Sequence, residues 1–425
     1  MRLPTFAAVA AVTLTCASAA RGTDSDVTVP TYHADAARSG HYVVPGLTWA
    51  RAGDVRRDAA FDGRVPGNVY AQPLYWRPAG AASGLVIVAT EDNAVVALDP
   101  VTGSTVWQQS LGAAVMGVAL PCSNIHPLGI TGTPVIDERN GALYLDAMVN
   151  RDGGPRHLVF ALSLADGALL PGWPVDVGDT LRAVNVSFDP RAQNQRGALA
   201  IVGDRLYLPY SGYYRVGCGG EYHGWVVGLR MDRPAAFGAW RTSTSGGGIW
   251  APGGIAYDGR FLFAVTGLKA GETEWGGSEA VIRLPPDLNW QPTPDEFFAP
   301  SDWNVTTALG GVNPLPIDLP DDGHGTALLL ALGNGRAYLL DRADLGGIGH
   351  PLAEQKVGDG GYIFSPAAYR SGPDMLAAFH IDGAVCPGKT HDDGHGRAAT
   401  GASHGLVRQL GWAGRPDRHH KRRYG

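Results

Sequence analysis

The chain has 425 residues, including 60 Gly and 30 Pro, and a formal net charge of −6 with only 17% charged residues. This balance excludes the continuous basic field by which proteins bind nucleic acid or anionic membranes. No stretch of 18 residues is apolar enough for a transmembrane helix, so none is expected.

Residues 1–19 are predicted to be a signal peptide. Met1-Arg2 gives a basic start, the apolar run Thr5 to Thr15 is too short to span a bilayer, and Ala17-Ser18-Ala19 fits a cleavage site. Lipidation at Cys16 is not favoured, because Thr15 stands where a smaller residue is usual. We therefore expect an exported protein, periplasmic or extracellular.

The stretch from Leu85 to Leu111 predicts three short strands joined by two tight turns. β-branched residues alternate before Glu91-Asp92-Asn93, which is typical turn chemistry, and Pro100 to Gly103 forms a second turn. Four residues define the spacing of this unit: Ala97, Asp99, Gly103 and Trp107. Asp99 is expected to cap the second turn, and Trp107 to pack across to a neighbouring sheet.

A strand-opening pattern, usually with a proline, recurs roughly every 59 residues. Each opening is followed by an apolar strand and a weaker echo of the Leu85 unit. The openings surround Pro73, Pro134, Gly197, Pro252, Pro314 and Pro366. Units of about four strands at a regular period predict an all-β propeller of four-stranded antiparallel blades, with about six recognisable blades.

The spacing Ala97-x-Asp99-x-x-x-Gly103-x-x-x-Trp107 resembles the tryptophan-docking motif of the PQQ-repeat propellers, the quinoprotein alcohol dehydrogenase-like superfamily. The resemblance covers roughly residues 31–388. It implies that the Trp of one blade docks on the next, and that the motif is structural rather than a cofactor ligand. A non-enzymatic branch of that superfamily is favoured.

The composition changes after residue 388. Residues 389–425 hold five histidines and eight Lys or Arg, without strand alternation, and are predicted to be an irregular tail. Two alternatives are a metal site, disfavoured because its histidines lack a rigid frame, and a frameshift that replaced a further blade. In the latter case the propeller is truncated and not fully closed. The stretch from Thr31 to Asp62 is then a candidate closing strand.

Three cysteines follow the signal peptide: Cys122, Cys218 and Cys386. One disulfide and one free thiol is the simplest expectation in an oxidising compartment, and the pairing is left open.

Two function classes with different chemistry compete with simple binding. Quinoproteins that hold PQQ use an adjacent cysteine pair, a Trp floor, Glu and Asn calcium ligands and a catalytic Asp, and this sequence has no adjacent cysteine pair. A hydrolase or lyase needs paired carboxylates. The acids of the right type are expected to be solvated turn residues: Glu91, Asp92, Glu272, Glu274, Asp295 and Asp302. We therefore predict no catalytic residue, no metal site and no cofactor, with PQQ and calcium as the alternative.

The favoured interpretation is a monomeric binding or scaffold module for a protein, glycan or small ligand. Residues just before the strand openings are expected to face the central channel: Tyr70, Gln72, Thr131, Trp250, Asn313 and Phe364. The competing interpretation is that their aromatic side chains merely fill the channel.

Overall fold

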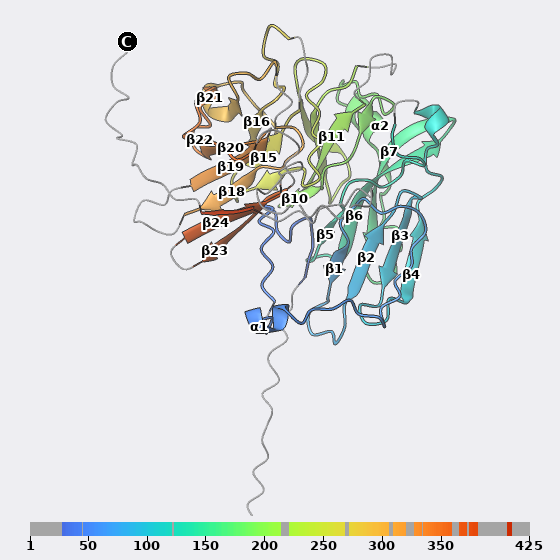
Figure 1. Ribbon diagram of the computed structural model, residues 1–425. Helices are drawn as coiled ribbons and strands as arrows, with labels where there is room; N and C mark the ends of the chain where they lie inside the picture. The colour runs from blue at the N-terminus through green and yellow to red at the C-terminus, as the bar shows by residue number, and fades with distance from the viewer. Residues whose placement is uncertain are drawn as a thin grey trace, which may run out of the picture.

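Six antiparallel sheets surround a common axis in the computed structural model (Figure 1). The structure describes residues 28–44, 46–120, 123–213, 221–267, 272–305, 309–319, 327–333, 335–358, 365–371, 374–380 and 406–409. The three cysteines and Phe364 lie outside the described residues, so the disulfide prediction is not tested. No helix in the described part is long and apolar enough to cross a membrane.

The six sheets are named blades 1 to 6 in chain order. Blade 1 contains β1 (Leu74–Trp76), β2 (Leu85–Ala89), β3 (Ala94–Leu98) and β4 (Thr105–Ser110). Blade 2 contains β5 (Val135–Asp137), β6 (Ala142–Arg151), β7 (Gly154–Ser163) and β8 (Val175–Asp176). Blade 3 contains β10 (Ala200–Val202), β11 (Arg205–Gly212), β12 (Trp225–Arg230) and β13 (Ala236–Arg241), with β9 (Gln193–Asn194) on β11. Blade 4 contains β14 (Ala256–Tyr257), β15 (Leu262–Val265), β16 (Val281–Leu284) and β17 (Phe297–Ala299), with β21 (Gly347–Ile348) parallel to β17. Blade 5 contains β18 (Leu315–Asp318), β19 (Ala327–Gly333), β20 (Arg336–Asp341) and β22 (Ala353–Lys356). Blade 6 contains β23 (Ala367–Ser371), β24 (Asp374–Phe379) and β25 (Leu406–Gln409).

Helices are few and short in the described residues. They are α1 (Trp49–Ala52), α2 (Val177–Arg182) and single 3₁₀ turns at Gly117–Ala119 and Pro294–Glu296. The predicted all-β propeller with six blades is confirmed, since an innermost strand follows each of the six predicted openings.

Blade 1 shows how its sequence produces its sheet. The Asp99 carboxylate accepts from the backbone amides of Val101 and Thr102 at 2.9 and 2.7 Å, which lowers the pKa of Asp99. Gly103 has a φ of +75° and closes the turn where a side chain would collide with backbone at Asp62 and Gly63. The turn therefore presents Trp107 at the start of β4 to blade 2.

Trp107 packs against blade 2. Its indole Nε1 donates to the carbonyl of Leu164 at 3.1 Å, and its ring lies on Gly167, where a Cβ would come within 2.6 Å of it. Trp173 and Trp240 occupy the cores between blades 2 and 3 and between blades 3 and 4. Five such apolar cores join successive blades from 1 to 6.

The sheets form an open, partial propeller. In the described residues no comparable apolar core joins blade 6 to blade 1; the second face of blade 1 instead carries a small cluster with Phe61 and Val65. The described positions within residues 31–62 contain no strand, contrary to the expected closing strand. The physical reason is that this segment bonds to the innermost strands of several blades and not to the edge of one.

One strand, β25, falls within residues 389–425, where an irregular tail is predicted. It pairs antiparallel with β24. The open edge of a β-strand accepts a neighbour through backbone bonds, which do not require side-chain alternation.

A buried ion pair within blade 2 is hydrogen-bonded to blade 3. His157 Nδ1 lies 2.7 Å from the Asp146 carboxylate, and the Tyr210 hydroxyl donates to the other Asp146 oxygen at 2.9 Å. His157 Nε2 lies 3.2 Å from the carbonyl of Gln193. Both ring nitrogens thus face acceptors, so the ring is protonated. Burial alone lowers the pKa of His157, but the neighbouring Asp146 charge outweighs it and the pKa is raised.

The docking of Trp107 leads to a quantitative expectation. Trp107→Ala should lower the free energy of unfolding by about 3–5 kcal/mol, because it leaves a cavity in the core between blades 1 and 2. Trp107→Phe should cost less, since it keeps most of the packing and loses the bond to Leu164. Chemical denaturation measures both, and equal losses for the two variants would contradict this role for the ring.

Candidate binding site in the central channel

The residues predicted to line the channel do not all lie in equivalent places. Gln72, Thr131 and Asn313 each precede an innermost strand. Thr131 and Asn313 are buried, Gln72 and Trp250 are half-buried, and Tyr70 is exposed. Phe364 lies outside the described residues. Their assignment to the channel lining stays a prediction.

Contacts between strand openings link four successive blades. The backbone N–H of Gln72 donates to Thr133 Oγ1 at 2.9 Å, and the backbone N–H of Leu199 donates to the Thr133 carbonyl at 3.1 Å. The Ala198 amide donates to the Pro252 carbonyl at 2.8 Å. Blades 1 to 4 are therefore linked directly at the channel.

The N-terminal segment 28–41, which we call the clasp, runs across the channel between β1 and β23 (Figure 1). Its central side chain, Arg38, has 0% exposure. Arg38 donates to the carbonyls of Leu199 and Ile255, both at 2.9 Å, and to Thr31 Oγ1 at 2.5 Å. The clasp thus occupies part of the channel with a guanidinium that donates four hydrogen bonds inside the protein.

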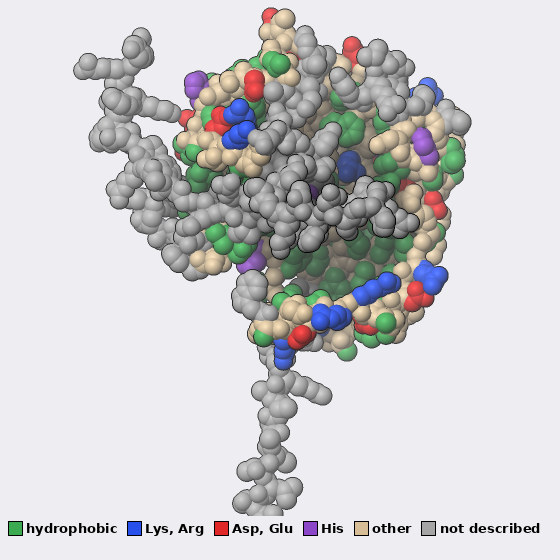
Figure 2. Space-filling model, viewed as in Figure 1, with side chains coloured by type: hydrophobic (Ala, Val, Ile, Leu, Met, Phe, Trp, Pro, Cys, Tyr) green, Lys and Arg blue, Asp and Glu red, His purple; other side chains and the backbone are tan. Residues whose placement is uncertain are grey.

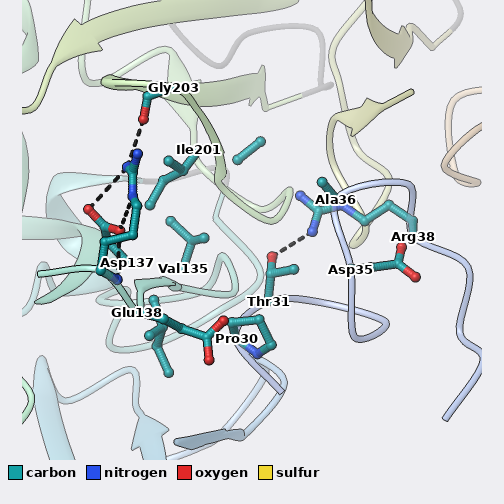
Figure 3. A pocket seen from close by; sticks show the side chains of 13 residues that line it. Pro30, Thr31, Asp35, Ala36, Arg38, Val135, Asp137, Glu138, Ile201 and Gly203 are labelled. Carbon is teal, nitrogen blue, oxygen red and sulfur yellow. Dashed lines mark hydrogen bonds and ion pairs between the residues drawn. The ribbon is translucent and has the colours of Figure 1, made fainter. Parts of the chain in front are cut away.

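A recess of about 300 Å³ opens beside the clasp, between blades 2 and 3 (Figure 3). Its charged side chains already have partners. Arg139 bonds to Asp137 at 2.9 Å and to the Gly203 carbonyl at 2.7 Å, and Glu138 accepts from Thr28 at 2.6 Å. With its polar groups satisfied, this recess is not the favoured ligand site.

Arg196 offers the contrasting case. It directly precedes the opening of blade 3 and is half-buried. Its charge lowers the pKa of Tyr32 of the clasp and of Glu91 of blade 1, so the three residues lie in the same region. In the described residues its guanidinium makes no hydrogen bond or ion pair. A half-buried cation without a partner is the feature expected of an anion site.

Two buried side-chain amides at the openings of blades 3 and 5 also have polar atoms without partners. The side-chain oxygen of Gln195 and both polar atoms of the Asn313 side chain have no hydrogen bond. Gln195 lies against Gly132 of blade 2, and Asn313 lies against Gly253 of blade 4, at positions where a Cβ on either glycine would collide with the amide. Unsatisfied buried polar atoms are rare in native proteins and point to a missing partner.

Glu91 is not the solvated turn acid that its sequence context predicts. It has 0% exposure, and its Oε2 accepts from the Gly129 amide at 2.7 Å. Burial raises its pKa, although the bonds from Gly129 and Thr131 and the charge of Arg196 oppose this. The first acid of the turn between β2 and β3 lies against Gly129, ahead of the first strand of blade 2, while Asp92 stays exposed.

The sequence does not indicate that Arg38, Gln195 and Arg196 belong to the candidate site. Neither arginine belongs to a motif, and the opening of blade 3 is the one without a proline. The only available signal was position, since Gln195 and Arg196 directly precede a predicted opening, as Gln72 and Asn313 do.

The fold is that of the PQQ-type alcohol dehydrogenase propellers, as comparison with solved structures shows. No family model and no curated protein matches the sequence.

Three solved structures illustrate the likeness. A europium-containing methanol dehydrogenase superposes with a TM-score of 0.57 at 15% identity, covering 84% of this chain and 70% of that one. A quinohemoprotein alcohol dehydrogenase from Comamonas testosteroni gives a TM-score of 0.55 at 15% identity, covering 78% of this chain and 49% of that one. BamB from Moraxella catarrhalis gives 0.41 at 15% identity, covering 74% and 82%. The chain thus spans about half the length of the alcohol dehydrogenase, and at these identities the likeness shows the fold alone.

The residues of this chain do not fit the ligands for PQQ and calcium that the fold family implies. The sequence has no adjacent cysteine pair. Across the described ranges, no three His, Cys, Asp or Glu side chains are placed to hold a metal ion. Glu91, the buried acid beside Arg196, uses one oxygen on Gly129 and has a raised pKa, which disfavours the charged form that calcium binds.

Proposed function

We propose that this protein is an exported, monomeric binding propeller whose channel takes a small ligand bearing a carboxylate, without quinone chemistry. The observation that carries the proposal is Arg196, a half-buried residue whose guanidinium has no hydrogen bond or ion pair in the described residues. A carboxylate pairs with a guanidinium through two parallel hydrogen bonds.

Polar atoms at two other strand-opening residues suit the rest of such a ligand. Asn313 supplies an unpartnered amide with both donor and acceptor, and Gln195 an unpartnered acceptor. These atoms would bond polar groups of the ligand that lie beyond its carboxylate. The surface favours a small ligand over a polyanion, since Lys and Arg are interspersed with Asp and Glu on the face in Figure 2.

Thermal unfolding with paired ligands tests the proposal. Succinate and citrate are compared with succinamide, which has the shape of succinate without its charge. We expect the acids to raise the melting temperature and the amide to leave it unchanged. Saturation at a hundred times Kd corresponds to about 2.7 kcal/mol of stabilisation.

Arg196→Gln should abolish the response to the acids, whereas Arg191→Gln, at an exposed arginine of the same segment, should retain it. A response that survives in Arg196→Gln, or an equal response to succinamide, would show that this guanidinium is not the anchor.

The alternative function is a PQQ- and calcium-dependent dehydrogenase, since two of the proteins that share this fold are named as dehydrogenases. PQQ itself bears carboxylates, so binding alone does not separate the two functions. Turnover of an alcohol with a dye as electron acceptor does.

A further inference from the structure

The clasp, residues 28–41, makes hydrogen bonds to five of the six blades. Val29 exchanges both backbone hydrogen bonds with Tyr75 of blade 1, at 2.7 and 3.2 Å. The Pro30 carbonyl accepts from Ile136 of blade 2 at 2.8 Å. One short segment without strand structure thus begins on the first blade and proceeds to the second.

Its second half reaches blade 4 and then the last blade. The Ala36 carbonyl accepts from the Tyr257 amide of blade 4 at 2.8 Å. The Ser39 carbonyl accepts from the Ala368 amide of blade 6 at 2.9 Å. Gly40 follows with a φ of +63°, at a place where a Cβ would lie 2.8 Å from that of Ala367. Backbone of the clasp and of β23 are therefore in close contact.

Arg38 fixes the path between these ends. It adopts a φ of +62°, which is uncommon for a residue with a side chain, and bonds to blades 3 and 4 through Leu199 and Ile255. Burial lowers its pKa to about 10, so it stays charged at neutral pH. Such a conformation persists only where the surroundings hold it on several sides.

The junction between blades 6 and 1 differs from the other five. Apolar cores fill the other junctions, but in the described residues no such core and no direct hydrogen bond joins blade 6 to blade 1. Figure 1 shows the N-terminal segment in this place, between β1 and β23.

We propose that the clasp closes the propeller in place of a core between the last and first blades, so that its release opens the channel along this one seam. The hydrogen bonds of Arg38 hold the clasp in place.

Severing the clasp in the folded chain tests the proposal. A protease site placed within the exposed residues 51–58 allows the full-length protein to be cut after folding. Hydrogen exchange is then followed in β23–β24 and in β1, with the β6–β7 hairpin as an internal reference. We expect the cut protein to keep its protection, because the clasp stays bound through its hydrogen bonds.

Cutting the Arg38→Met variant should release the clasp fragment on size exclusion. Exchange in β1 and β23–β24 should then rise about a hundredfold while that of β6–β7 stays unchanged. Arg64→Gln, at an exposed arginine outside the clasp, should behave as the parent protein. If Arg38→Met does not fold, an excess of free peptide 28–44 is added to the cut parent protein in mild guanidinium. It should restore protection of both seam strands, and the peptide carrying Arg38→Met should not.

Release of the fragment without faster exchange at the seam would overturn the proposal. Equal acceleration in all six blades would also overturn it, because that result describes general destabilisation and not a seam.

Discussion

Arg38→Met should lower the free energy of unfolding by about 3–5 kcal/mol. The substitution leaves the carbonyls of Leu199 and Ile255 and the Thr31 hydroxyl without their donor inside the protein. Each buried polar group without a partner costs about 1–3 kcal/mol. Guanidinium unfolding of the variant and the parent protein measures the difference.

Arg64→Met is the matched control. Its side chain is 85% exposed and pairs only with exposed Asp62, so less than about 1 kcal/mol should be lost. Similar losses for the two arginine variants would remove the structural role assigned to Arg38.

The second large effect is expected at the buried ion pair of blade 2, which Tyr210 of blade 3 also contacts. His157→Leu should lower the free energy of unfolding by about 3–5 kcal/mol, because it leaves the buried Asp146 charge without its partner. Tyr210→Phe removes one neutral donor to Asp146 and should cost about 1–2 kcal/mol.

The sign of the pH dependence follows from the raised pKa of His157. Its contribution to stability is fully present below the unfolded pKa of about 6.5 and is lost as the pH rises through the higher folded value. The melting temperature of the parent protein should therefore fall as the pH rises from neutral toward 9.

His157→Gln should be less stable at pH 6 and should lack this part of the slope. His350→Gln, at an exposed histidine, should keep the slope. A parent protein and a His157→Gln variant with the same slope would contradict the buried imidazolium.

The repeating part of the fold could be predicted from the sequence because blades recur. Each opening marks an innermost strand, and the spacing from Asp99 to Trp107 reports a turn and a docking ring that are local in the chain. Local turn chemistry does not say which way a turn faces. For that reason Glu91, in an ordinary turn sequence, is expected in solvent but lies buried against Gly129.

The clasp and the candidate site depend on contacts that no local pattern records. Arg38 bonds to Ile255, 217 positions away, and nothing in the residues around it indicates that bond. Arg196 is notable because its guanidinium has no partner among the described residues. That can be recognised only from the three-dimensional surroundings of the residue. The prediction that Gln72, Thr131 and Asn313 line the channel rested on strand openings alone.

The central claim is that this chain uses a dehydrogenase-type propeller for binding and not for quinone chemistry. Its most direct test is titration of the purified full-length protein with PQQ in the presence of calcium, followed by dye-linked oxidation of alcohols. We expect no turnover of alcohol at any PQQ concentration, whether or not PQQ binds at Arg196. Stoichiometric uptake of PQQ accompanied by calcium-dependent alcohol oxidation would contradict it.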